Sequence, residues 1–248
     1  GDCYTILGDD ITLDCAGHTI IGNATGIGVN VSGFDNATII NCMLSNFSSG
    51  IHINNSINSN ISNNSVYDSS VAGLELFDSN STIINNNYFE NNQDGLDLIF
   101  DSQWNEITSN WFVDNGIGLN STSSNNSIYN NYFENSVNVD DQGNNTWNTT
   151  FSCSTNISEF NILDEPCMGG NYWSDYISLG GADNGSGVAP YDESPWNISE
   201  DGIGDLLIPF NSSDNISVPG DYLPLLYVPV ECGLINRSTR LNQNLVSN

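Results

Sequence analysis

The fold is decided by a pattern that is clearest in the stretch Ile83-Ile84-Asn85-Asn86-Asn87-Tyr88-Phe89-Glu90-Asn91-Asn92-Gln93-Asp94-Gly95-Leu96. Within it, an isoleucine precedes a second apolar residue by five positions, an asparagine stands two positions before that residue, and a Gly-aliphatic pair follows. Each feature recurs with a spacing of 21 to 24 residues, which chance composition does not easily produce. The recurring sets are Ile39, Ile61, Ile84, Ile107 and Ile128; Leu44, Val66, Phe89, Phe112 and Phe133; Cys42, Asn64, Asn87, Asn110 and Asn131; and Gly26-Ile27, Gly50-Ile51, Gly73-Leu74, Gly95-Leu96 and Gly118-Leu119.

This period predicts an all-β fold, a parallel β-helix (β-solenoid) with coils of about 22 residues and three short strands per coil. Leucine-rich repeats have a similar length, but their leucines at fixed offsets are missing. Helical repeats are longer, and the abundant Asn, Ser, Thr, Ile and Gly are poor helix formers. We expect successive coils to pair as parallel strands about 4.8 Å apart, with the apolar columns stacked inside.

The asparagine and glycine columns are expected to be structural. An asparagine at a corner between strands tolerates the left-handed conformation, and its amide can hydrogen-bond the asparagines of the coils above and below. The glycine before each aliphatic residue is expected to occupy a tight corner of positive φ.

Six cysteines indicate disulfides, because none belongs to a Cys-x-x-Cys pair of the kind used for zinc or redox chemistry. The run from residue 11 to residue 22 has the features of a first full coil, which places Cys15 one coil from Cys42 within disulfide reach. Cys153 and Cys167 flank a short loop and are predicted to form a second bridge. Two cysteines remain, and they would pair with each other or across subunits: Cys3 and Cys232.

The charge balance excludes several classes of protein. The 248 residues include 30 acidic residues, no lysine and only two arginines, Arg237 and Arg240, for a formal net charge of −28. Nucleic-acid binding requires basic stripes that are missing here. No Gly-rich phosphate loop or dinucleotide fingerprint is present, so we expect no organic cofactor. No apolar run approaches the length of about 20 residues that a membrane span needs, so we expect no membrane insertion.

The repeat fades after about residue 145, which divides the chain into three predicted regions. Parallel β-helix coils occupy residues 1–146, a loop-rich cap rich in Gly, Pro, Trp and Tyr occupies 147–230, and a polar tail occupies 231–248. Little sequence precedes Cys3 to cover the first strand edges, so we expect a second subunit to cover them. Arg237 and Arg240 in the tail are the candidate contacts with an acidic neighbour.

We expect the protein to be exported from the cell. Disulfides require an oxidising compartment, and the sequence is interpreted as a mature extracellular form whose export signal has been removed. Asn-x-Ser/Thr acceptor patterns are frequent, although a chain this rich in Asn, Ser and Thr generates many by chance. The glycosylation candidates are Asn23, Asn30, Asn36, Asn46, Asn60, Asn80, Asn120, Asn148, Asn197 and Asn236.

Several motifs resemble one known family. The run Leu13-Asp14-Cys15-Ala16-Gly17-His18-Thr19-Ile20, the coil repeats and Gly169-Gly170-Asn171-Tyr172-Trp173-Ser174-Asp175-Tyr176 are similar to NosD-like right-handed parallel β-helix repeat proteins, also called CASH domains. Asp201-Gly202-Ile203-Gly204-Asp205 and Asp221-Tyr222-Leu223-Pro224-Leu225 extend the resemblance to about residue 226. The resemblance implies that the β-helix is right-handed. It also implies an archaeal surface protein, for example a methanogen sheath or surface-layer subunit.

The resemblance also implies copper handling, for which few donors are present. Copper sites use His, Met and Cys. His18 and His52 share no motif, and Met43 and Met168 are too few for a thioether site. We therefore do not expect a copper site.

Catalysis on sugars has some support in the sequence but lacks its signatures. Glycoside hydrolysis needs two carboxylates at a fixed separation, and Asp94 and Asp97 flank the Gly95 corner, where both are expected to face solvent. The paired-Asp, Gly-His-Gly and Arg signatures of β-helix pectin hydrolases are missing, and the candidate basic groups for a lyase, Arg237 and Arg240, lie in the tail. We predict that the protein is not an enzyme. The aromatic residues available for stacking on sugars are Trp104, Trp111, Trp147, Trp173 and Trp196, of which Trp173 is expected in the cap core and Trp111 on an exposed flank.

A calcium site in the cap is the metal site that the pattern favours. Short Asp spacing and Gly turns supply oxygen ligands on flexible loops, although solvated loop residues in Asx turns would give the same pattern. The candidate ligands are Asp183, Asn184, Asp192, Asp201 and Asp205.

Two functions follow from these features. The leading interpretation is an exported, disulfide-bonded glycoprotein that self-assembles with copies of itself into a sheath, surface layer (S-layer) or filament of the cell envelope. The alternative is a monomeric extracellular β-helix that binds or processes glycans.

Overall fold

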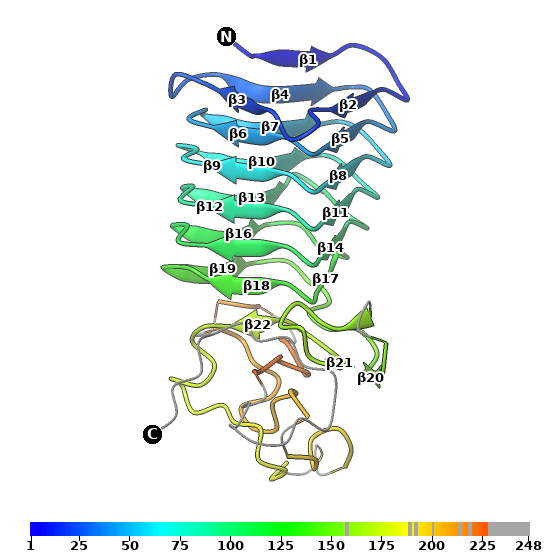
Figure 1. Cartoon of the computed structure of the whole chain (residues 1–248), viewed down its shortest axis with the longest axis vertical. Coiled ribbons are helices and arrows are strands. Elements are labelled where there is room, and N and C mark those ends of the chain that lie inside the picture. Colours follow the sequence, from blue (N-terminus) through cyan, green and yellow to red (C-terminus); the bar gives the residue numbers. More distant parts are fainter. Residues whose placement is uncertain are drawn as a thin grey trace.

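The computed structural model describes residues 1–156, 159–187, 190, 193–199, 201–212, 215–217 and 220–227. In these residues the protein is all-β, and its strands form a solenoid with a loop-rich region at one end (Figure 1). Each coil contributes one strand to each of three parallel sheets, as the repeat predicts. None of the described residues forms a helix long and apolar enough to cross a membrane.

The three sheets run the length of the solenoid. Sheet A contains the longest strands, β1 (Tyr4–Ile6), β4 (Ile27–Ser32), β7 (Ser49–Asn54), β10 (Ala72–Phe77), β13 (Asp94–Ile99), β16 (Ile117–Ser121) and β19 (Val137–Asp141). Sheet B contains β2 (Thr12–Asp14), β5 (Thr38–Ile40), β8 (Asn60–Ser62), β11 (Ile83–Asn85), β14 (Glu106–Thr108) and β17 (Ser127–Tyr129). Sheet C contains β3 (Thr19–Ile21), β6 (Met43–Ser45), β9 (Ser65–Tyr67), β12 (Tyr88–Glu90), β15 (Trp111–Val113), β18 (Tyr132–Glu134) and β22 (Tyr172–Trp173).

Strict register stacks the apolar columns inside the solenoid. Ile84 pairs with Ile61 on one side and Ile107 on the other, and all three side chains are fully buried. Phe89 and Phe112 stack with ring centroids 5.2 Å apart. Because side chains alternate between the two faces of a strand, each buried residue is flanked by outward-facing ones.

Asparagine ladders connect the coils at their corners. Asn110 Nδ2 donates to Asn131 Oδ1 at 3.0 Å, and Asn110 Oδ1 accepts from Asn87 Nδ2 at 3.0 Å and from Asn87 N at 2.9 Å. The predicted hydrogen bonding between the asparagines of adjacent coils is therefore confirmed. The left-handed conformation, however, belongs to the residue before each ladder asparagine, for example Asn86 (φ 54°) and Asn130 (φ 57°). The ladder side chain points inward because its own backbone keeps the ordinary negative φ.

Two further ladders have the same chemistry and escaped the sequence analysis. Asn92 Nδ2 donates to Asn115 Oδ1 at 3.1 Å, and Asn126 Nδ2 donates to Asn145 Oδ1 at 3.0 Å. Each buried amide also donates to a backbone carbonyl, so corner groups that would otherwise be unsatisfied have partners.

The glycine column has a different role from the one predicted. Of the five glycines, only Gly26 has a positive φ (73°). At Gly73 and Gly95, a Cβ atom would lie 2.8 Å and 2.5 Å from the carbonyl oxygen of the next glycine in the column. These glycines are required because the backbones of adjacent coils approach too closely for any side chain.

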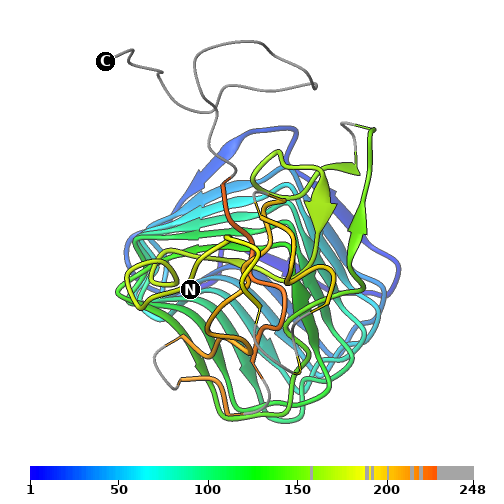
Figure 2. The same cartoon turned by 90° about the horizontal axis from the view of Figure 1, so that it is seen from below.

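The loop-rich region closes the last coil. Trp173 stacks on Phe133 with ring centroids 4.7 Å apart, and Trp147 and Tyr176 are buried beside them. Figure 2 shows these loops lying across the end of the solenoid. Within the region, the fully buried Asp221 accepts hydrogen bonds from Asn171 N and Trp173 Nε1, at 2.7 Å and 2.9 Å.

Both predicted disulfides are present. Cys15 and Cys42 join adjacent coils with a Cα–Cα distance of 4.8 Å. Cys153 and Cys167 join β20 (Ser152–Cys153) to β21 (Cys167–Met168), an antiparallel pair beside the solenoid. Cys3 is exposed and forms no disulfide with a described residue, and Cys232 lies outside those residues.

The opposite end of the solenoid is open. Strands β1, β2 and β3 each have one neighbour in their sheets, so their outer edges have no strand partner in the part of the chain that the structure describes. Leu7 and Ile21 at this end are 78% and 71% exposed. The other end is closed by the loops of the cap (Figure 1).

Loss of one ladder amide should destabilise several coils. We expect Asn110→Ala to lower the free energy of unfolding by about 2–4 kcal/mol, because it leaves buried donors and acceptors of two neighbouring coils without partners. Asn144→Ala, at an exposed position, should change it by less than about 0.5 kcal/mol. Urea denaturation of the oxidised protein measures both values, and equal losses in the two variants would contradict a structural role for the ladder.

Candidate functional site

A column of polar side chains runs along the outer face of sheet A. The strand register places one such residue per coil: Asn30, His52, Glu75, Asp97, Asn120 and Asp140. The residues on either side of Glu75, Leu74 and Leu76, are fully buried in the core. The column therefore points outward from the solenoid.

The centre of this column is acidic and poorly solvated. Asp94 and Asp97 are each 8% exposed, which corrects the expectation that both face solvent. Asn120 Nδ2 donates to Asp94 Oδ2 at 3.2 Å, and His52 Nε2 lies 3.6 Å from Glu75 Oε1. The Oδ1 atoms of both aspartates are buried and have no hydrogen-bond partner. A ligand hydroxyl would satisfy such atoms, because buried polar groups are stable only when hydrogen-bonded.

Burial raises the pKa of Asp97 to about 8, with further contributions from its hydrogen bond to Asp94 and from the charges of Asp94 and Glu75. Asp97 therefore carries a proton at neutral pH. The hydrogen bond to Asp94 occupies that proton, so the pair presents acceptor oxygens to a ligand.

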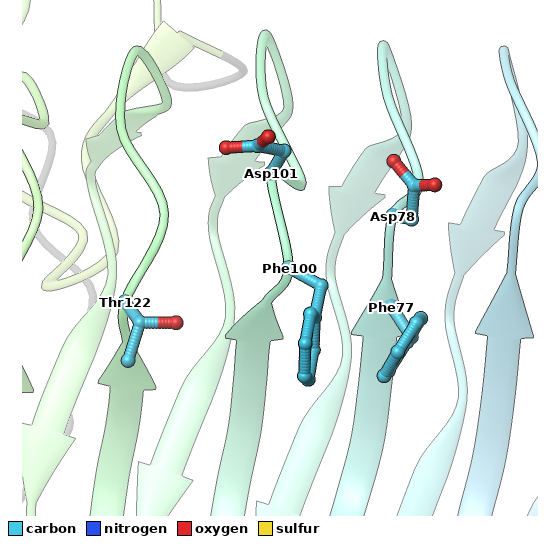
Figure 3. Close-up of a pocket in the computed structure, with 5 residues that line it drawn as sticks. All are labelled: Phe77, Asp78, Phe100, Asp101 and Thr122. Atoms are coloured by element: carbon cyan, nitrogen blue, oxygen red, sulfur yellow. The ribbon is translucent and has the colours of Figure 1, made fainter.

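A pocket of about 420 Å³ lies at the end of β10 and directly after β13 (Figure 3). The rings of Phe77 and Phe100 stack with centroids 4.2 Å apart, and Phe100 is 64% exposed. Asp78 and Asp101 lie next to them on the turns, and Thr122 completes the lining.

The pocket arises from a departure from the repeat. Phe77 pairs with Ile99, and Ser79 N donates to Ser102 Oγ at 3.1 Å, so two residues, Phe100 and Asp101, occupy the space that Asp78 fills one coil earlier. Phe100 has a φ of 51°, which is uncommon for a bulky residue. The recurrence of Phe-Asp at a spacing of 23 residues was visible in the sequence but was not used.

Trp111 does not lie on the exposed flank that the sequence predicts, whereas Trp173 lies in the core as expected. Trp111 is half-buried, and its ring stacks on Tyr132 with centroids 4.3 Å apart, so a face that a sugar would need is occupied. Trp147 and Trp173 belong to the core, as predicted for Trp173. Trp196 Nε1 donates to the backbone oxygen of Tyr222 at 2.8 Å. Trp104 is 66% exposed.

The donors for copper do not converge. His18 precedes β3 of sheet C and is exposed, whereas His52 lies in β7 of sheet A. Met43 lies beside Thr19, and Met168 belongs to the separate β20–β21 pair. Across the described residues, no group of three or more His, Cys, Asp or Glu side chains is placed to hold a metal ion. A copper site therefore does not fit this arrangement.

Most of the cap residues predicted to bind calcium are brought together. Asn184 N donates to Asp205 Oδ2 at 2.6 Å, and Asp183 Oδ2 accepts from Gly202 N at 2.9 Å, directly after Asp201. Asp192 lies outside the described residues. Calcium binding stays a prediction.

The acceptor asparagines fall into two groups by exposure. Asn23, Asn36, Asn46 and Asn197 are exposed, whereas Asn30, Asn60, Asn80, Asn120 and Asn148 are half-buried. The amide of Asn120 is engaged with Asp94, so a glycan there would disrupt the acidic column. The remaining candidates lie outside the described residues: Asn236, Arg237 and Arg240.

The raised pKa of Asp97 predicts a pH-dependent stability. The folded chain holds a proton on Asp97 up to about pH 8, whereas the unfolded chain releases it near 3.8, so this group makes the folded state less stable as pH rises between those values. Asp97→Asn removes the effect. We expect the free energy of unfolding of Asp97→Asn, relative to the unsubstituted protein, to rise by about 1–3 kcal/mol between pH 4 and pH 9.

Urea titrations at several pH values test this expectation. The exposed Asp114 provides the control, because Asp114→Asn should follow the unsubstituted protein at every pH. A pH-independent difference for Asp97→Asn would contradict the raised pKa.

Comparison with known families agrees with the fold. The model of the family described as "Periplasmic copper-binding protein (NosD)" matches residues 8–178, which cover most of the solenoid and the start of the cap. No curated protein matches the chain. Since the match spans well over half of the sequence, this chain belongs to the NosD family.

Proposed function

We propose that this protein is an exported β-helix that binds a neutral, hydroxyl-rich glycan across the outer face of sheet A. The family is described as periplasmic, and two disulfides agree with an oxidising compartment. One observation carries the proposal: the exposed Phe100, stacked on the half-buried Phe77, directly follows β13, whose Asp94 and Asp97 have buried oxygens without a hydrogen-bond partner among the described residues.

The chemistry of this face matches a sugar ring. The exposed Phe100 offers a flat apolar surface for the C–H face of a sugar, and the carboxylates of Asp78 and Asp101 accept hydrogen bonds from its hydroxyls. Asp94 and Asp97 accept hydrogen bonds through their Oδ1 atoms, which have no partner among the described residues. A net charge of −28 disfavours acidic glycans unless cations screen the repulsion.

We propose that the protein binds the glycan without cleaving it. The Gly-His-Gly signature of β-helix pectin hydrolases is missing from the sequence. The described residues include no lysine or arginine that would neutralise an acidic sugar at a lyase site.

A glycan array of neutral and acidic oligosaccharides, followed by calorimetry on the best ligand, tests the proposal. We expect neutral glycans to bind and Phe100→Ala to weaken binding at least tenfold, equivalent to about 1.4 kcal/mol, because the stacking surface is lost. Tyr4→Ala removes an exposed aromatic at the far end of the solenoid and should leave the affinity unchanged. Unaltered binding by Phe100→Ala would exclude this surface.

Self-association is a second candidate, favoured by the open end of the solenoid. The outer edges of β1, β2 and β3 present unpaired backbone groups, and the apolar Leu7 and Ile21 are exposed beside them. Because the cap covers the other end, edge pairing alone joins two copies around a two-fold axis and then stops. A sheath, layer or filament needs a second contact, for which the tail with Arg237 and Arg240 is the remaining candidate.

Sedimentation velocity and electron microscopy test the second candidate. We expect the unsubstituted chain to form dimers or larger assemblies, and the double variant Leu7→Asp with Ile21→Asp to be monomeric because charge blocks the edge. Ile83→Asp, at a partly exposed site in the middle of sheet B, serves as the control. A monomeric unsubstituted chain at all concentrations would exclude edge pairing.

A further inference from the structure

The cap contains a second group of carboxylates, held where two loops meet. Gly202 N donates to Asp183 Oδ2 at 2.9 Å, and Asn184 N donates to Asp205 Oδ2 at 2.6 Å. Each loop thus supplies a carboxylate to the backbone of the other. This geometry places Asp183 and Asp205 beside the same crossing point, next to Asp201.

Two carboxylate oxygens at the crossing have no hydrogen-bond donor. Asp201 Oδ1 accepts from Ile203 N at 2.9 Å, and Asp205 Oδ2 accepts from Asn184 N. Asp201 Oδ2 and Asp205 Oδ1 are buried and have no hydrogen-bond partner among the residues that the structure describes. Asp205 is only 1% exposed, so water has little access to it. An unsatisfied, buried carboxylate oxygen is unfavourable and implies a missing partner.

The carboxylates at the crossing face no lysine or arginine among the described residues. Burial, together with the charges of Asp183 and Asp205, raises the pKa of Asp201 to about 6. Burial also raises the pKa of Asp205, with a contribution from the charge of Asp183. The sequence contains no lysine and both arginines lie in the tail, so none of the described residues is a lysine or arginine that could neutralise these carboxylates.

We propose that Asp201 and Asp205 bind a calcium ion through their free oxygens, with Asp183 adding negative charge at the same place. Calcium takes six to eight oxygen ligands and accepts backbone carbonyls and water in irregular loops. Two carboxylate ligands are therefore sufficient, which agrees with the finding that the described residues contain no larger group of metal-binding side chains. Magnesium demands a stricter octahedral geometry, and copper requires nitrogen or sulfur donors that are not among these three residues.

The ion would stabilise the cap by fastening its two loops. Tyr176, which is fully buried against the last coil, donates a hydrogen bond to the backbone oxygen of Leu206, immediately after Asp205. A Cβ atom at Gly204 would meet the hydroxyl of Tyr176, so this loop packs tightly on the core. Binding of calcium to the folded state alone raises stability in proportion to the logarithm of its concentration.

Calorimetric titration of CaCl₂ into the full chain, prepared free of metal, tests this proposal together with thermal unfolding. We expect saturable binding and a higher Tm with calcium. Asp201→Asn and Asp205→Asn should lose this binding and the rise in Tm. Without calcium, both variants should be at least as stable as the unsubstituted protein, because the substitution removes a buried charge while the side chain keeps one oxygen.

The exposed Asp114 provides the control for calcium binding. Asp114→Asn removes one negative charge from an exposed site on the solenoid and should retain calcium binding, which separates the cap site from weak binding to the acidic surface. The proposal is wrong if the unsubstituted protein shows no saturable binding, or if Asp201→Asn binds calcium as the unsubstituted protein does. Because Asp201 accepts only a local hydrogen bond, its substitution keeps the test valid even if Asp205→Asn fails to fold.

Discussion

Every coil of this solenoid depends on hydrogen bonds that its polar groups make to the next coil at the corners. The chain turns three times per coil, and each turn interrupts the regular strand pairing and leaves backbone groups facing the interior. Asn64, Asn87, Asn110 and Asn131 satisfy those groups, and Asn171 extends the same ladder into the cap. The stacking works only in one register, so the ladder also fixes which strand residues face the core.

The same register that builds the core makes the surface repetitive. Residues at equivalent positions lie one strand spacing apart, about 4.8 Å, so a polar position repeated in several coils becomes a column of like groups. Glu75 and Asp97 are such neighbours on sheet A, and with no lysine in the chain the repulsion between these two acidic groups is relieved by a retained proton. Departures from the repeat create local features, as the additional residue at Phe100-Asp101 shows by opening a pocket.

The scarcity of positively charged residues has consequences at two places in the molecule, the outer face of sheet A and the cap. On sheet A, a carboxyl group stays protonated, and in the cap two carboxylate oxygens remain without a partner. At both places, buried carboxyl oxygens have no hydrogen-bond partner among the described residues. The proposed hydroxyl-bearing and cationic ligands would supply those partners.

The sequence by itself determined the coil, its three strands, the stacking of the apolar and asparagine columns and both disulfides, because each depends on spacing along one repeated unit. It identified Asp94, Asp97 and the cap aspartates but not their burial, and it assigned the wrong reasons to the glycines and to the left-handed corners. The tertiary structure decided those points. Close approach of two backbones at Gly95, desolvation of Asp97 and the crossing of the cap loops at Asp205 arise between segments far apart in the chain, where local spacing contains no information.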